Sequence, residues 1–222
     1  MLNRRLFILG IGSTAFFPIA LRAQSCDQLG TYEGILTFEP QADGRYMRIA
    51  RPYSYIDNCG VNWNVPEGAI VDGASIPRPL WSIVGAPLTG VYRDASVIHD
   101  WYCAVRTRTH LATHKMFYEA MTISGVSERQ AKLMYLAVRK FGPKWDDLTI
   151  ANNKINSREG NERVTELTPD GLRATARSDN KALGNSAENL RMQSEYLNYA
   201  ETVTANNLNI SEIDDLVDGG AL

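Results

Sequence analysis

The chain has 222 residues, of which 44% are hydrophobic and 22% are charged, and its formal net charge at neutral pH is -2. This composition is typical of a globular protein, and the length allows one large domain or one domain with an appendage. Because basic and acidic residues nearly balance, nucleic acid is not an expected partner.

The N-terminal segment, residues 1–23, is predicted to be an export signal. A basic start at Arg4 and Arg5 leads into an apolar run and then a small-residue cleavage site near Ala23. The run is short and interrupted by glycine and proline, so it is poorly suited to crossing a membrane. The paired arginines followed by Phe7 resemble the twin-arginine signal. We therefore expect an exported protein, periplasmic or extracellular. An ordinary secretory signal, an uncleaved anchor and a lipoprotein site are the alternatives.

Three cysteines, Cys26, Cys59 and Cys103, follow the predicted cleavage site. Export would place them in an oxidising compartment, where a disulfide can form. The sequence leaves open which of them pair.

Strand-type patterns come first along the chain. Short β-prone runs at 35–38 and 46–49, joined by the turn-forming stretch 40–44, predict a β-hairpin. A further extended segment is expected at 61–65. Prolines and glycines then exclude a continuous helix, so 72–78 is predicted to be an ordered loop.

Apolar residues spaced three or four apart predict three amphipathic helices after this loop. The first begins near Val91, the second covers 109–124, and the third is capped by Ser127 and stops at Gly142. The fold class is therefore α+β: N-terminal antiparallel strands or a hairpin, then three packed helices, then a largely irregular C-terminal tail.

The predicted compact domain covers residues 27–145. Residues 146–185 are rich in Asn, Ser, Thr and charge, which predicts a polar linker. Residues 186–222 are predicted to be an acidic tail with weak helices. We expect this tail to be available to a protein partner and not to be needed for folding of the domain.

The side chains able to carry chemistry concentrate in one stretch that holds all three histidines of the chain. They are Asp72, Ser75, His99, Asp100, His110 and His114. His110 and His114 stand four apart, so they share one helix face and should point toward the protein body. Imidazoles from two helices with a carboxylate suit a divalent metal such as zinc. The candidate metal ligands are His99, Asp100, His110 and His114.

Other roles for these residues remain open. His99 beside Asp100 fits a general base next to a cation-binding carboxylate. Ser75 fits a nucleophile with His99 as its base, although the strand–turn–helix elbow of such nucleophiles is lacking. The non-catalytic interpretation is a turn at Asp72 and Ser75 whose side chains bond nearby amides, with buried histidines bonded to carbonyls. In each case Asp72, Ser75, His99 and Asp100 are predicted to meet in space.

A series of motifs runs from the strands to the third predicted helix. They are VPEG at 65–68, DGASIPR at 72–78, HDWY at 99–102, FYEAM at 117–121 and YLAVRKFG at 135–142, with Trp81, Tyr92 and Arg93 between them. In order and spacing these motifs resemble a family of bacterial and phage proteins, the domain of unknown function numbered 1353. The resemblance covers about residues 31–145 and implies domain boundaries but no activity. Where the family usually has Asp on the second helix, this chain has His114.

A second resemblance is to secreted phospholipases A2, in which a His-Asp pair on one helix faces an Asp on an antiparallel helix. It implies that His99 is the base, Asp100 a calcium ligand and His114 the orienting residue. The chain departs from this pattern at His114, because a neutral imidazole does not stabilise a neighbouring imidazolium as a carboxylate does. The glycine-rich calcium loop is also absent from the sequence.

Two functional hypotheses follow. In the first, the protein is an exported metal-assisted hydrolase with a His-Asp centre, acting on an envelope component or lipid with zinc or calcium as cofactor. In the second, it is a non-catalytic structural or interaction module, associated with a phage or the cell envelope, whose His-Asp cluster is a buried polar network. A hydrolase needs an open pocket at His99, whereas the module needs only satisfied hydrogen bonds.

The twin-arginine interpretation is tested by replacing Arg4 and Arg5 together with lysine. We expect the double variant to remain in the cytoplasm, because that export route recognises the arginine pair rather than its charge. Cell fractionation measures the outcome. Normal export of the double variant would contradict the twin-arginine route and leave the general secretory route.

Overall fold

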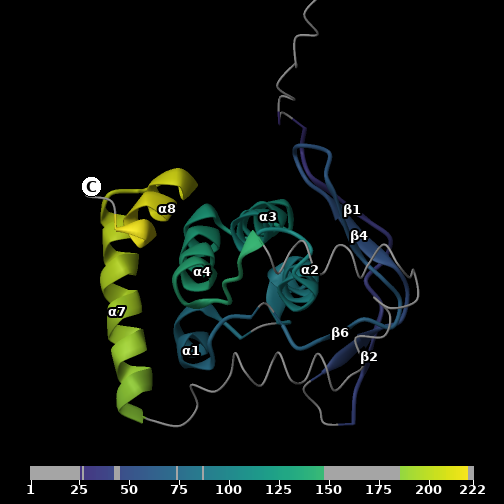
Figure 1. The fold of residues 1–222 in the computed structure, drawn as a ribbon, viewed down its shortest axis with the longest axis horizontal. Helices are drawn as coiled ribbons and strands as arrows, with labels where there is room; N and C mark the ends of the chain where they lie inside the picture. Colours follow the sequence, from purple (N-terminus) through teal and green to yellow (C-terminus); the bar gives the residue numbers. More distant parts are fainter. Residues whose placement is uncertain are drawn as a thin grey trace, which may run out of the picture.

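The computed structural model describes residues 26, 28–42, 46–73, 75–86, 88–147 and 186–219. The strands come first in the chain and the helices follow, and Figure 1 shows them on opposite sides of the molecule. The predicted α+β class is confirmed. The predicted export signal and nearly all of the predicted linker lie outside the described residues.

Two three-stranded antiparallel sheets make up the strand side. In the first sheet the order is β1 (Thr31–Glu33), β4 (Tyr53–Ile56) and β5 (Asn62–Val65); in the second it is β2 (Phe38–Pro40), β3 (Met47–Ile49) and β6 (Ile70–Val71). The predicted hairpin is found as β2–β3, with Phe38 opposite Ile49, but its first strand covers Phe38–Pro40 rather than the predicted 35–38. The predicted extended segment at 61–65 is β5, where Trp63 and Val65 are buried and the asparagines between them are exposed.

Tyrosine hydroxyls fasten the first sheet to the helices. Tyr53 of β4 donates to the carboxylate of Asp94 over 2.7 Å, and Tyr55 of the same strand donates to Glu119 over 2.7 Å. Tyr32 of β1 packs its ring against both of these tyrosines, with ring centroids 5.8 Å and 5.0 Å apart. The sheet therefore reaches two different helices through side chains of one strand.

The helical half begins after an irregular loop, as predicted for 72–78. Its elements are η1 (Arg78–Leu80), α1 (Trp81–Val84), η2 (Gly90–Tyr92), α2 (Arg93–Val105), α3 (His110–Ile123) and α4 (Glu128–Phe141). Thr109 caps α3 and Ser127 caps α4, each by accepting an amide hydrogen bond. Within the described parts of the chain, no helix is long and apolar enough to cross a membrane.

A disulfide joins Cys26 to Cys59. Cys26 precedes β1, and Cys59 lies in the turn between β4 and β5. The bond therefore ties the start of the described chain to the first sheet. Cys103 lies outside this disulfide and is buried in α2.

The C-terminal helices α7 (Ser186–Ala205) and α8 (Ile210–Asp218) pack on the domain. Figure 1 shows α7 beside α4 and α1 at the edge of the molecule. Tyr196 and Ile213 are fully buried, and the Tyr196 hydroxyl donates to the Leu133 carbonyl oxygen of α4 over 3.1 Å. Removal of the tail would expose the apolar surface of α4, so these contacts favour a stabilising role for the tail. The expectation that the tail is not needed for folding stays a prediction.

A charged cluster fixes α8 to the helices beneath it. The carboxylate of Asp214 accepts hydrogen bonds from Arg139 over 2.8 Å and from Tyr135, and it lies 2.8 Å from the Lys115 ammonium nitrogen. Burial alone would raise the pKa of Asp214, but the hydrogen bonds from Lys115, Tyr135 and Arg139 lower this pKa below its usual value. Arg139 also bonds Asp218 over 2.7 Å, so one guanidinium holds two carboxylates of α8.

Replacing Asp214 with Asn should lower the free energy of unfolding by about 2 kcal/mol at neutral pH, because charge-assisted hydrogen bonds are lost. The native pKa of Asp214 lies below the unfolded value of about 4, so its contribution is complete above that value and is lost as the pH falls through the native pKa. Urea unfolding of wild type and variant between about pH 7 and pH 3 measures this difference.

The difference should stay constant down to about pH 5 and shrink below about pH 4. Glu201→Gln, at an exposed position of α7, is the control and should leave stability unchanged. A difference that persists undiminished at about pH 2 would contradict the ion-pair explanation.

Candidate functional site

Helices α2 and α3 bring two of the predicted histidines together in the interior. The side chains of His99 and His114 are fully buried, and His99 Nε2 lies 2.8 Å from His114 Nδ1. The His99 ring also packs on Phe117, with ring centroids 4.6 Å apart. As predicted, His114 shares the inward face of its helix with Phe117 and Met121, both fully buried. The helix periodicity therefore places His114 correctly.

Hydrogen bonding assigns the tautomers of this pair. His114 Nε2 lies 3.3 Å from the Pro143 carbonyl oxygen, which only accepts, so this nitrogen carries a hydrogen. Burial and the neighbouring His99 hold the pKa of His114 well below its usual value, so the ring is neutral and its Nδ1 is an acceptor. His99 Nε2 therefore donates to His114 Nδ1.

Cys103, one turn beyond His99 on α2, completes a buried group that we call the His–Cys–His cluster: His99, Cys103 and His114. Its Sγ lies 3.7 Å from His99 Nε2 and 3.8 Å from His99 Nδ1. One ligand atom from each residue lies within 4.8 Å of the others. Trp145 covers the cluster, packing on Cys103 and contacting the His114 ring edge-on. The sequence prediction omitted Cys103 as a ligand, although its spacing of four from His99 places both on one helix face.

His110, a predicted ligand, lies beside the cluster rather than in it. Its Nδ1 donates to the Trp145 carbonyl oxygen over 3.0 Å. Its ring meets Trp145 edge-on, and its centroid lies 6.0 Å from that of His114. The indole of Trp145 in turn donates to the Arg108 carbonyl oxygen over 2.6 Å. His110 therefore helps to hold the Trp145 cover in place.

Asp100, the next residue after His99, faces the loop that precedes α1. One carboxylate oxygen accepts from the amides of Asp72 over 2.7 Å and Gly73 over 3.3 Å, and the other accepts from the Ser75 hydroxyl over 2.9 Å. Burial raises the pKa of Asp100 well above its usual value, and the negative charge of Asp72 adds to this, while the three hydrogen bonds oppose it. Asp100 therefore clamps the loop to α2.

Ser75 takes a left-handed backbone conformation, with φ of 50°. Non-glycine residues adopt this conformation only where the surroundings compensate for its cost. The bond to Asp100 supplies part of that compensation. It also occupies the Ser75 hydroxyl with a carboxylate, whereas the nucleophile hypothesis required His99 as its partner.

The prediction that Asp72, Ser75, His99 and Asp100 meet in space is thus only partly met. Asp72, Ser75 and Asp100 come together, but Asp72 contributes its amide to the contact with Asp100. The ring of His99 packs instead against residues of α3. The predicted metal ligands divide in the same way, with Asp100 on the loop and His99 and His114 in the cluster.

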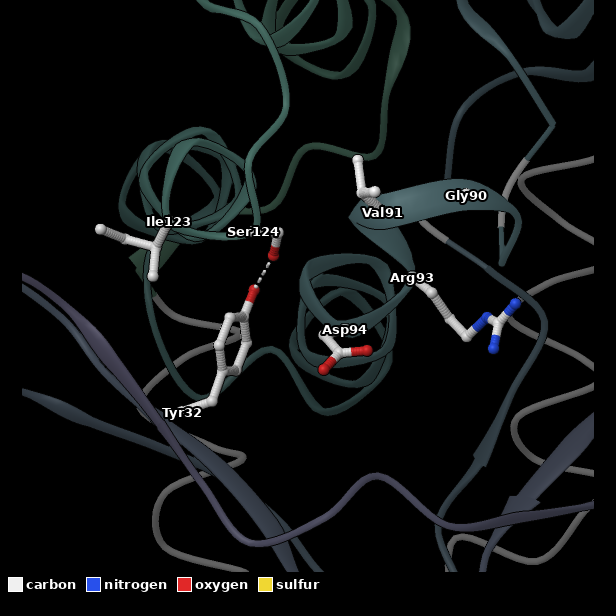
Figure 2. A pocket seen from close by; sticks show the side chains of 7 residues that line it. All are labelled: Tyr32, Gly90, Val91, Arg93, Asp94, Ile123 and Ser124. Carbon is white, nitrogen blue, oxygen red and sulfur yellow. Dashed lines mark hydrogen bonds between the residues drawn. The ribbon is translucent and has the colours of Figure 1, made fainter.

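A cavity of about 330 Å³ lies elsewhere, between β1, the start of α2 and the end of α3 (Figure 2). Its lining residues are Tyr32, Gly90, Val91, Arg93, Asp94, Ile123 and Ser124. In Figure 2 the Tyr32 hydroxyl points to Ser124, at 2.8 Å, and the guanidinium of Arg93 points away from Tyr32. Neither His99 nor His114 is among the residues that line this cavity.

The site defines an α+β domain with a buried histidine centre and a carboxylate-held loop. Residues 47–138 match the family model described as Protein of unknown function (DUF1353), so this part of the chain is similar to that family. The resemblance inferred from the motifs is thereby confirmed.

Two relatives in Sinorhizobium fredii are similar to this chain, and both are described as uncharacterized. The protein y4jT is 39% identical over 153 residues, which is 68% of this chain and 45% of that protein. The protein y4iH is 42% identical over 103 residues, which is 46% of this chain and 43% of that protein. The chain thus spans less than half the length of these relatives. No solved structure matches it.

The clamp is tested by replacing Asp100. Asp100→Ala leaves the Asp72 and Gly73 amides without their acceptor, so the free energy of unfolding should fall by about 3 kcal/mol. Asp100→Asn keeps one acceptor oxygen and should lose about half as much. Urea unfolding measures both, with the exposed Glu201→Ala as control. An Asp100→Ala variant within about 0.5 kcal/mol of wild type would show that the clamp does not stabilise the domain.

Proposed function

We propose that this protein is an exported, non-catalytic module whose His99–Asp100 segment is its structural centre. The observation that carries the proposal is that the side chains of His99 and His114 are 0% exposed. A general base must come within hydrogen-bond reach of the proton that it removes. The buried ring of His99, packed against Phe117 and His114, is not so placed.

The state of Asp100 supports the same proposal. In a phospholipase-like centre, this carboxylate would share a calcium ion with oxygen ligands of a neighbouring loop. Here the loop directs two amides and a hydroxyl at the carboxylate, and these are donors. N–H groups repel a cation, so the loop occupies the position where calcium would be needed. This argues against the metal-assisted hydrolase with a calcium ion at Asp100.

Export is supported by two separate features. The first is the Arg4-Arg5 segment with its apolar run, which has the composition of a signal. The second is the Cys26–Cys59 disulfide, because such bonds persist in oxidising compartments and are rare in the cytosol. Cys26 follows the predicted cleavage site near Ala23 by three residues, so the disulfide would hold the start of the mature chain.

The structural role is tested by chemical modification of histidine. The mature protein, with a chelator present, is treated with diethyl pyrocarbonate, and modified residues are identified by mass spectrometry. We expect His99 and His114 to react at least about 100-fold more slowly than in urea-unfolded protein, because the reagent reaches only opened molecules. Equal rates in native and unfolded protein would overturn the proposal.

A second measurement addresses catalysis directly. Hydrolysis of simple esters and of anionic phospholipid vesicles is followed with calcium or zinc added. We expect wild type and His99→Ala to give the same background rate. Hydrolysis by wild type that is lost in a natively folded His99→Ala protein would overturn the proposal in favour of the hydrolase.

A further inference from the structure

The His–Cys–His cluster has the composition and placement of a metal site. His99 and Cys103 come from consecutive turns of α2, and His114 comes from α3, so the three donors belong to two packed helices. All three side chains are buried, with Cys103 3% exposed and the histidines fully enclosed. Their ligand atoms lie within 4.8 Å of one another.

His114 is already oriented as a metal ligand. Metal-binding histidines commonly donate their second ring N–H to a carbonyl or carboxylate, which fixes the ring and its tautomer. The Nε2 of His114 does so toward the Pro143 carbonyl oxygen at 3.3 Å. The lone pair on Nδ1 therefore points at His99 Nε2.

Two of the three ligand pairs have distances that can be compared with those around a bound ion. The third pair, Cys103 with His114, lies within 4.8 Å. Bonds of about 2.0 Å to nitrogen and 2.3 Å to sulfur place ligand nitrogens about 3.4 Å apart and nitrogen about 3.6 Å from sulfur. The Cys103 Sγ to His99 Nε2 distance is 3.7 Å, which fits. The His99 Nε2 to His114 Nδ1 distance of 2.8 Å must lengthen by about half an ångström, which a small ring rotation provides.

We propose that His99 Nε2, Cys103 Sγ and His114 Nδ1 together bind one thiophilic d10 metal ion, zinc(II) or copper(I). The donor set of two imidazoles and one thiolate suits these ions, whereas calcium and magnesium require oxygen ligands. The thiolate neutralises the single charge of copper(I), while zinc(II) leaves one positive charge in the interior. Burial of an uncompensated charge is costly, so copper(I) is the better electrostatic match.

Protons balance in the binding step. The thiol of Cys103 loses its proton to solvent as the sulfur–metal bond forms. The ring proton of His99 moves from Nε2 to Nδ1, so the nitrogen facing the metal has a free lone pair. No electron is transferred. Binding therefore releases one proton and weakens as the pH falls.

The site deepens the structural role proposed above and rests on it, because an ion shared by His99 and Cys103 of α2 and His114 of α3 stabilises the contact between these two helices. The metal-free full-length mature protein is titrated with zinc(II), with copper(I) under reducing conditions, and with cobalt(II) as a spectroscopic probe. We expect one ion per chain, a thiolate-to-cobalt charge-transfer band, and a rise in melting temperature with saturating metal. Competition with a chromophoric chelator shows whether zinc(II) or copper(I) binds more tightly.

Variants identify the ligands. Cys103→Ser and His114→Gln should each weaken binding by at least about 100-fold, since loss of even an outer partner costs about tenfold or more. Glu201→Gln, at an exposed position of α7 away from the cluster, is the control and should bind as wild type does. Wild-type protein that binds neither zinc(II) nor copper(I), or an equal loss in the Glu201 variant, would overturn the proposed ligand set.

The wild-type spectrum tests the proposal even if a variant fails to fold. Metal titration tests the metal site and histidine modification tests the structural role, so the two proposals can fail separately. Slow histidine modification without metal binding would leave a hydrogen-bonded pair that is structural. Metal binding with fast modification would contradict the closed site and favour a reactive one.

Discussion

Side chains of consecutive residues in an α-helix point in directions that differ by about 100° around the helix axis. In α2 this rotation directs the neighbours His99 and Asp100 toward two different parts of the fold. His99 packs against α3, while Asp100 holds the loop that leads into α1. One helix thereby connects both halves of the fold, since that loop follows directly from β6 of the second sheet. The same rotation explains why His99 and Asp100 belong to different local structures although they are adjacent in sequence.

Local features of the sequence were sufficient for much of the fold. The caps at Thr109 and Ser127, the β2–β3 hairpin and the inward face of α3 depend on residues close together in the chain, where spacing translates directly into geometry. The short helix α1 and the division into two sheets were not predicted. Both depend on how segments pack after they form, which periodicity does not encode.

The candidate site shows the same limit. Spacing placed His114 on the buried face of its helix, and the loop was correctly expected to approach Asp100. Because His99 and Asp100 are adjacent in sequence, a joint role was expected. The contacts of a side chain depend on which element packs against it, however, and His99 and Asp100 face different elements. The Trp145 cover and the Pro143 carbonyl come from beyond α4. Contacts of such long sequence separation leave no local pattern to recognise.

The composition of the C-terminal segment has an explanation within the chain. Acidic side chains of α7 and α8 pair with basic ones of α3 and α4: Asp214 with Lys115 and Arg139, Asp218 with Arg139, and Glu195 with Lys140. An acidic tail suggests an external basic partner when only its composition is considered. Here part of that acidity is complementary to the neighbouring helices, so charge orients α8 while apolar residues such as Ile213 hold it.

The Cys26–Cys59 disulfide also determines how the domain bears load from its N-terminal end. Strand β1 is only three residues long, lies at the edge of the first sheet and pairs there with β4. A pulling force applied at Cys26 passes through the sulfur bridge to the turn between β4 and β5, bypassing the hydrogen bonds of β1. The covalent link thus makes the central strand, rather than the weak edge strand, the mechanical anchor of the domain to whatever precedes it.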